Sequence, residues 1–144
     1  DLISKRPVRI TRDLAEQLIS ADPTGLESTA SGLVSDTFRE MRTNLLHPVV
    51  IVDYLREAYL HPAEEVRITF DMQLRSGLNS VDMFNPYLPT VPPFDHDEII
   101  LEVKYNQVLP PYIASLLTYA LRDGACRSAI SKYVYCRRFE FKDF

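Results

Sequence analysis

Glycine is scarce in this chain, and its glycines do not form a phosphate-binding loop. Only four glycines occur among 144 residues, and neither Gly-x-x-x-x-Gly-Lys nor Gly-x-Gly-x-x-Gly is present. The nucleophile pattern Gly-x-Ser-x-Gly is missing as well. Any phosphate would therefore have to be held by side chains rather than by the backbone of a glycine-rich loop.

Cysteine and histidine are also rare, and their spacing does not suit a zinc site. The chain has two cysteines, Cys126 and Cys136, and three histidines, and these are not grouped at the intervals of zinc-binding motifs. Two cysteines are too few for a disulfide framework. We therefore expect a reducing, cytoplasmic location in which both residues are buried thiols.

Long apolar runs are missing too. No stretch approaches the roughly 20 apolar residues that a membrane-spanning helix needs, and no signal peptide is visible. The chain begins with Asp1 rather than Met, so we expect its start to be a cut or an internal boundary. Apolar residues make up 46% and charged residues 25% of the chain, which predicts one globular domain with a packed core.

The net charge has the wrong sign for general binding of polyanions. It is −4 at neutral pH, so no overall field attracts nucleic acid, and we expect no nucleic-acid partner. An anion site would have to come from a local arrangement of basic side chains.

Periodicity and turn residues predict an α+β fold. Two β-rich runs, 49–59 and 65–74, are separated by a turn at His61–Glu64 and should pair as a hairpin. A third strand is expected over 98–105, after a proline-rich loop at 76–97. Further expected elements are a short extended piece at 3–10, a helix over 13–19 capped by Thr11, a helix capped by Ser35 and ended by Pro48, a helix from Pro110 to Gly124, and a last helix over 128–138.

Each expected strand has an apolar face and a face that carries charge, because alternate side chains point to opposite sides. One interpretation is a sheet whose charged face is solvated. The other turns the charged face inward, into a water-filled tunnel that binds polyanions, with helices covering the apolar face outside. Periodicity cannot separate the two. The charged faces carry Arg56, Glu65, Arg67, Asp71, Glu98, Glu102 and Lys104.

Four local motifs, taken in order and spacing, resemble the VTC domain, the polyphosphate polymerase domain of the vacuolar transporter chaperone family. The match is strongest to the bacterial stand-alone branch of this family, which belongs to the triphosphate tunnel metalloenzymes. The motifs are Tyr54–Tyr59, Val66–Asp71, Ile100–Tyr105 and Ile130–Tyr133, and the stretch Leu88–Pro92 supports them.

The resemblance implies a fold in which an antiparallel β-sheet forms part of a β-tunnel or barrel, with helices packed outside and at the C-terminus. It implies that residues 1–144 are the C-terminal part of a single tunnel domain, since the Glu-x-Glu-x-Lys strand of the first half is not found here. A tunnel without that half could not close. We therefore expect catalysis from the complete domain and not from this part alone.

The resemblance also assigns roles to individual residues. It implies that Arg56, Arg67 and Lys132 are catalytic and bind phosphate oxygens, which suits guanidinium and ammonium groups. Lys5 and Lys104 are further phosphate-binding candidates, although Lys104 could instead pair with a carboxylate on its own face. Glu102 is implied to be a ligand of Mg²⁺ or Mn²⁺. The alternative is that Glu102 forms an ion pair with a neighbouring basic group.

The function implied is transfer of the γ-phosphoryl group of ATP to a growing polyphosphate chain, so the expected partners are ATP and inorganic polyphosphate. Two alternatives stay open: a tripolyphosphate or nucleoside triphosphate hydrolase, and a non-catalytic polyphosphate-binding domain. The sequence also leaves open whether the protein forms a homo-oligomer and whether it has a membrane-associated partner.

Overall fold

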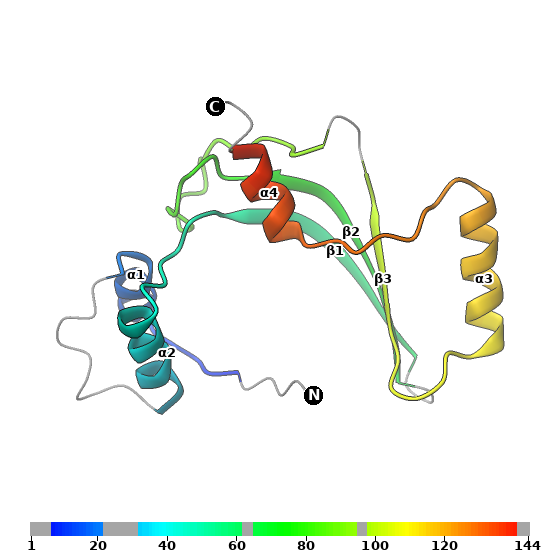
Figure 1. The fold of residues 1–144 in the computed structure, drawn as a ribbon, viewed down its shortest axis with the longest axis horizontal. Coiled ribbons are helices and arrows are strands. Elements are labelled where there is room, and N and C mark those ends of the chain that lie inside the picture. The colour runs from blue at the N-terminus through cyan, green and yellow to red at the C-terminus, as the bar shows by residue number, and fades with distance from the viewer. Residues whose placement is uncertain (1–6, 22–31, 62–64, 95–97, 141–144) are drawn as a thin grey trace. The chain divides into compact units, whose positions relative to one another are not determined.

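The computed structural model describes residues 7–21, 32–61, 65–94 and 98–140. The chain divides into two compact units, and each is described separately. The first contains Asp1–Val49 and Ser80–Pro86, and the second contains Val50–Asn79 and Tyr87–Phe144. Figure 1 shows the elements of both units along the chain.

The first unit contains helices α1 (Arg12–Ile19) and α2 (Gly32–Thr43). Thr11 caps α1 as predicted, because its side-chain oxygen accepts a hydrogen bond from the backbone N–H of Leu14. Ser35 does not cap α2, which begins three residues earlier, at Gly32. Val34 and Phe38 lie one turn apart and are both buried, so packing of this stripe favours helix through the expected cap position.

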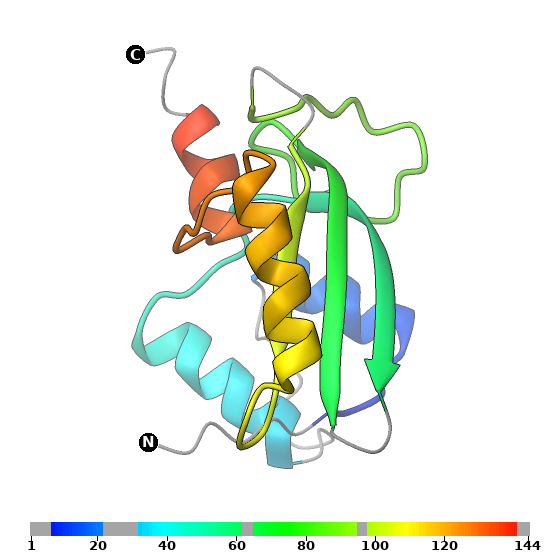
Figure 2. The same cartoon turned by 90° about the vertical axis from the view of Figure 1, so that its right-hand side faces the viewer.

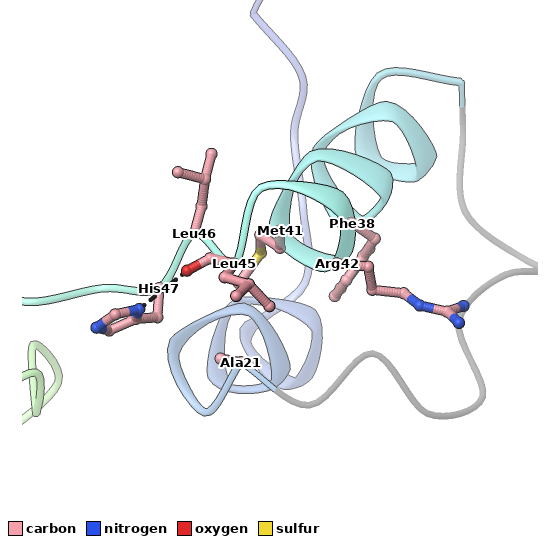
Figure 3. Close-up of a pocket in the computed structure, with 7 residues that line it drawn as sticks. All are labelled: Ala21, Phe38, Met41, Arg42, Leu45, Leu46 and His47. Atoms are coloured by element: carbon pink, nitrogen blue, oxygen red, sulfur yellow. Dashed lines mark hydrogen bonds between the residues drawn. The ribbon is translucent and has the colours of Figure 1, made fainter.

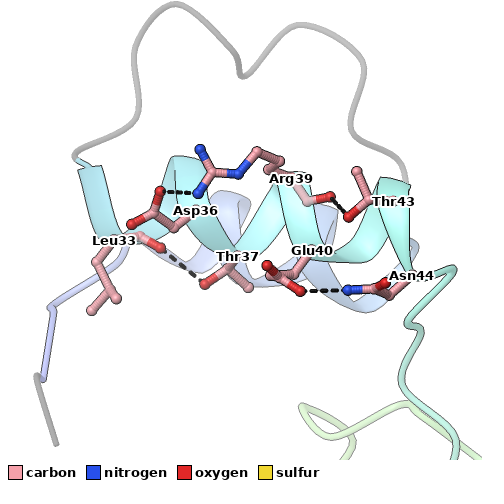
Figure 4. Close-up of polar contacts among 7 residues, drawn as sticks. All are labelled: Leu33, Asp36, Thr37, Arg39, Glu40, Thr43 and Asn44. Carbon is pink, nitrogen blue, oxygen red and sulfur yellow. Dashed lines mark hydrogen bonds and ion pairs between the residues drawn. The ribbon is translucent and has the colours of Figure 1, made fainter. Parts of the chain in front are cut away.

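The exposed side of α2 is held by contacts within the helix (Figure 4). Arg39 Nη2 lies 2.8 Å from Asp36 Oδ1, and Asn44 Nδ2 lies 2.5 Å from Glu40 Oε2. Such short-range pairs on a surface each contribute about 0.2–0.5 kcal/mol. They support the helix without forming a site.

The second unit contains a three-stranded antiparallel sheet in the order β1 (Val52–His61), β2 (Val66–Ser76) and β3 (Ile100–Lys104). The predicted hairpin of the first two strands is confirmed, although residues 62–64 lie outside the described part. Helices α3 (Pro111–Arg122) and α4 (Lys132–Glu140) follow. The α+β prediction is therefore confirmed. The sheet is not closed into a barrel, and the tunnel remains a prediction.

A β-bulge divides the hairpin into two parts. Asp53 pairs with Arg75 and Leu55 with Met72, so Gln73 and Leu74 of β2 together lie opposite Tyr54 of β1. Gln73 has a φ of 52°, in the left-handed region. The extra residue shifts the alternation of side chains along β2, so Asp71 and Leu74 are brought to the same face of the sheet.

The bulge explains where α4 packs. We expected helices to cover the apolar face, yet α4 packs on the face that carries Asp71, near the bulged end of the hairpin. Leu74 packs there against Cys136 of α4 and Ile100 of β3 in a small apolar core. Figure 1 shows α4 crossing β1 and β2, and Figure 2 shows the hairpin in green from a second side.

The opposite face of the sheet is only partly covered. Leu55 is 56% exposed, Tyr59 57% and Leu101 38%, while Val66 on the same face is buried. The expected outer layer of helices over these residues is therefore not found in the described part of the second unit. Of the two thiols that we expected to be buried, Cys136 is buried and Cys126, in the loop after α3, is exposed.

Gly77, just after β2, packs too closely against a neighbouring segment to tolerate a side chain. Its N–H donates to the carbonyl oxygen of Ile51 at 3.0 Å, and a Cβ at this position would lie 2.9 Å from Ile51 Cβ. We predict that Gly77→Ala lowers the free energy of unfolding by about 1–3 kcal/mol, as overpacking does. Urea denaturation would measure the change.

Gly32→Ala is the control, because a Cβ at Gly32 meets nothing within 4 Å and alanine favours helix. This variant should be neutral or slightly stabilising. Equal denaturation midpoints for the two alanine variants would contradict the overpacking argument.

Candidate phosphate-binding face

The charged face of the sheet is organised around Asp71, whose side chain is 1% exposed. Arg56 lies directly opposite Asp71 in the hairpin and binds both carboxylate oxygens, with Nε–Oδ1 at 2.5 Å and Nη2–Oδ2 at 2.6 Å. Lys132, at the start of α4, places Nζ 2.5 Å from Oδ2. One buried carboxylate therefore holds two cations that come from different elements.

An aromatic ring lies beside the same two cations. The ring centroid of Tyr54 is 5.1 Å from Arg56 Cζ and 5.1 Å from Lys132 Nζ. Both distances are within the range of cation–π attraction. The arginine and the lysine keep part of their surface open, with side chains 31% and 20% exposed. We refer to Arg56, Asp71 and Lys132 as the Asp71 triad.

The triad changes the protonation properties of its members. Hydrogen bonds from Arg56 are the main cause that lowers the pKa of Asp71 to about 2, and Lys132 adds to the effect, while burial opposes it. In return, the hydrogen bond to Asp71 raises the pKa of Arg56 above its ordinary value. Asp71 is therefore a carboxylate throughout the physiological pH range.

This lowered pKa predicts a pH dependence of stability. Between the ordinary pKa of 3.8 and about 2, the unfolded chain binds more protons at Asp71 than the folded chain does. The contribution of Asp71 to stability is therefore present above about pH 4 and lost as the pH falls towards about 2. In urea denaturation from about pH 6 to about pH 2, the stability difference between wild type and Asp71→Asn should shrink as the pH falls. A difference that stays constant with pH would contradict the assignment.

A second charged group lies along the same face, towards the hairpin turn. Arg67 of β2 is directly opposite Lys104 of β3, and Thr69 is directly opposite Glu102. Lys104 Nζ lies 3.0 Å from Glu102 Oε1, so these two form an ion pair. Arg67 is exposed and has no hydrogen bond or ion pair among the described residues. Among the described residues, nothing occupies its donors.

Thr69 is a further polar residue of this face. It is 2% exposed, and its hydroxyl oxygen has no hydrogen-bond partner in the described part of the chain. Directly opposite residues on one face have their Cβ atoms about 4.5–5.5 Å apart, so Thr69 and Glu102 are close neighbours. Their side chains place oxygen atoms that can act as metal ligands beside one another.

The sequence placed most of these residues correctly on one face. The register puts Arg56, Arg67, Glu102 and Lys104 on the same side of the sheet, as the alternation of side chains indicated. Lys132 joins them only through the packing of α4. Lys5 lies outside the described residues.

Asp71 itself was not among the predicted site residues, although it was assigned to the charged face. The expected turn does not give this pair, because pairing the two runs about His61–Glu64 would set Arg56 opposite Thr69. In the structure His61 pairs with Val66, and this register sets Arg56 opposite Asp71. The contact of Lys132 with this carboxylate had no local signal either.

Other parts of the described chain offer weaker candidates. A hollow of about 430 Å³ lies in the first unit, beside the end of α2 (Figure 3), and its lining is mostly apolar, including Phe38, Met41 and Leu45. Such a lining does not suit a phosphate chain. No group of three or more histidine, cysteine or acidic side chains that could hold a metal ion occurs within the described ranges. Each helix described is too short or too polar to span a bilayer.

Comparison with known protein families identifies the chain. The family model described as the VTC domain matches residues 2–141, which is nearly the whole sequence, and the chain belongs to this family. Searches of curated proteins and of solved structures found no match. Membership of the family relates the chain to polyphosphate.

Proposed function

We propose that this chain is part of a polyphosphate polymerase domain, in which the charged face binds a row of phosphates during transfer of the γ-phosphoryl group from ATP. The observation that carries the proposal is the register of the sheet. Arg56 and Arg67 of the hairpin, Lys104 of β3 and Lys132 of α4 lie along one face, and membership of the VTC family supplies the polyphosphate context.

The arrangement suits a linear polyanion better than a single ion. Arg67 and Lys104 stand opposite one another, and Arg56 is four residue pairs further along the hairpin, so positive charge is spread along the strands. Phosphates in a chain repeat at short intervals and need several cations in a row. Each charge-assisted hydrogen bond contributes about 1.5–3 kcal/mol. The planar fork of arginine also fixes the orientation of a phosphate.

The reaction proposed needs little covalent chemistry from the protein. A terminal phosphate oxygen of the growing chain attacks the γ-phosphorus of ATP, the bond from that phosphorus to the bridging oxygen breaks, and ADP leaves. The work of the protein in such transfers is positioning and neutralisation of charge. Arg56, Arg67 and Lys132 are proposed to supply both.

A divalent cation fits this face only in company with phosphate. Glu102 and the hydroxyl of Thr69, which has no hydrogen-bond partner among the described residues, provide hard oxygen ligands, which Mg²⁺ and Mn²⁺ prefer. Asp71 is already bound to Arg56 and Lys132, so it is not free to serve as a ligand. We propose that Glu102 would hold the ion beside the phosphates, where the ion would neutralise charge, and that Lys104 would then be released towards phosphate.

The decisive experiment uses the complete natural protein with ATP and Mn²⁺, and separates the products by length on a gel. Long polymer supports the polymerase. Free phosphate without polymer would establish the hydrolase instead, and binding of polyphosphate without turnover would establish a binding domain. Failure to bind polyphosphate and failure to turn over ATP would together reject the whole proposal.

A further inference from the structure

Asp71 is an unexpected residue at the centre of a face that we propose to bind anions. Its charge has the same sign as phosphate, so Coulomb interaction alone would make it unfavourable. It is nevertheless the most buried member of the triad, at 1% exposure, and it forms ion pairs with both cations. Its position therefore calls for an explanation other than direct contact with a ligand.

The contacts indicate what Asp71 does. Its Oδ1 and Oδ2 bind Nε and Nη2 of Arg56, which fixes the plane of the guanidinium, while Nη1 has no hydrogen-bond partner among the described residues. Its Oδ2 also binds Lys132, which brings the ammonium group of α4 beside the arginine of β1. The ring of Tyr54 lies within cation–π distance of both cations.

We propose that Asp71 is a positioning residue of the phosphate site, which holds Arg56 and Lys132 side by side before phosphate arrives. This inference rests on the proposed function. Long side chains lose rotamer freedom when they are ordered, and a site in which they are already ordered does not lose this freedom again on binding. Asp71 lowers the entropic cost of binding in this way while it stays out of reach of the ligand.

The proposal makes a prediction whose sign differs from that of simple electrostatics. Asp71→Asn removes one negative charge from a phosphate-binding face, so charge alone predicts tighter binding of a polyanion. Loss of positioning predicts weaker binding, because a neutral amide no longer fixes both cations. We expect the affinity of the complete protein for tripolyphosphate, measured by calorimetry, to fall about tenfold or more.

The matched control is Asp53→Asn. Asp53 is an exposed carboxylate of β1 on the opposite face of the sheet. The substitution therefore removes the same charge without changing the triad. Its affinity for tripolyphosphate should stay within about twofold of wild type. Unchanged or tighter binding by Asp71→Asn, in a protein that is folded by circular dichroism, would overturn the proposal.

A second measurement needs no variant of Asp71, in case that variant does not fold. In the free wild-type protein, the Nε–H of Arg56 should give a resolved, slowly exchanging NMR signal, assigned by its loss in Arg56→Lys. A signal that appears only after tripolyphosphate is added would mean that the arginine is not held beforehand, and would overturn the proposal.

Arg67→Gln separates failure of this inference from failure of the proposed function. Arg67 lies outside the triad, so its loss should weaken tripolyphosphate binding whether or not Asp71 positions its partners. If Arg67→Gln weakens binding and Asp71→Asn does not, only the positioning role fails. If the wild-type protein does not bind tripolyphosphate, the proposed function fails, and the positioning role fails with it.

Discussion

Replacing Asp71 by alanine is expected to lower the free energy of unfolding by about 3 kcal/mol. Removing one partner of a buried ion pair typically costs 3–5 kcal/mol, because the other charge is left uncompensated. Here the cations left behind are Arg56 and Lys132, whose side chains are 31% and 20% exposed. Water can therefore reach both, and the lower end of the range applies.

The measurement is urea denaturation at neutral pH, with Asp53→Ala as the matched control. Asp53 is an exposed carboxylate of the same hairpin, and its removal should change stability by no more than about 0.5 kcal/mol. The double variant Asp71→Ala with Lys132→Met adds a further check. Because it removes one of the stranded charges, it should recover part of the loss. Equal stability of Asp71→Ala and Asp53→Ala would contradict the central place that we give to Asp71.

Replacing Arg67 by alanine is expected to reduce polyphosphate synthesis by the complete protein about 10²–10³-fold. Removal of one preorganised charge-stabilising group from an active site typically costs about 2.7–4 kcal/mol of transition-state stabilisation. Arg67 is the cleaner test of the proposed catalytic cations. Arg56 and Lys132 also hold the triad together, so their loss would affect folding, whereas Arg67 is exposed and pairs with no described residue.

The rate would be measured as polymer formed from ATP and Mn²⁺ under single-turnover conditions. Arg39→Ala is the control, because Arg39 is an exposed arginine of α2 with an ion pair to Asp36. This variant removes the same charge, but from the first unit. Arg67→Lys should retain part of the activity, since it keeps the positive charge but loses the planar set of donors of the guanidinium. A rate for Arg67→Ala within twofold of wild type would remove Arg67 from the catalytic residues.

Local sequence was sufficient for the elements and for much of the candidate face. The hairpin, the third strand and the cap of α1 follow from alternation, turn residues and capping chemistry, which act over a few residues. The same alternation placed Arg56, Arg67, Glu102 and Lys104 on one side. The start of α2 was wrong because burial of Val34 and Phe38 outweighed the capping preference of Ser35.

The bulge at Gln73 shows where local rules stop. Nothing in the alternation of Val66–Asp71 indicates that the next residues shift by one, since a bulge is selected by what it allows to pack. It turns Leu74 to the charged face, and Leu74 gives α4 a place to pack there. Within the second unit, α4 therefore packs on the charged face and not on the apolar face.

The sequence by itself determined which residues carry the charge, which face of each strand they occupy and which family the chain belongs to, because these depend on residue type and short-range order. Tertiary structure decided that Lys132 of the last helix meets Arg56 of the first strand on one buried carboxylate. That meeting depends on a bulge and on the packing of α4, and contacts between residues distant in the chain are set by packing rather than by local pattern.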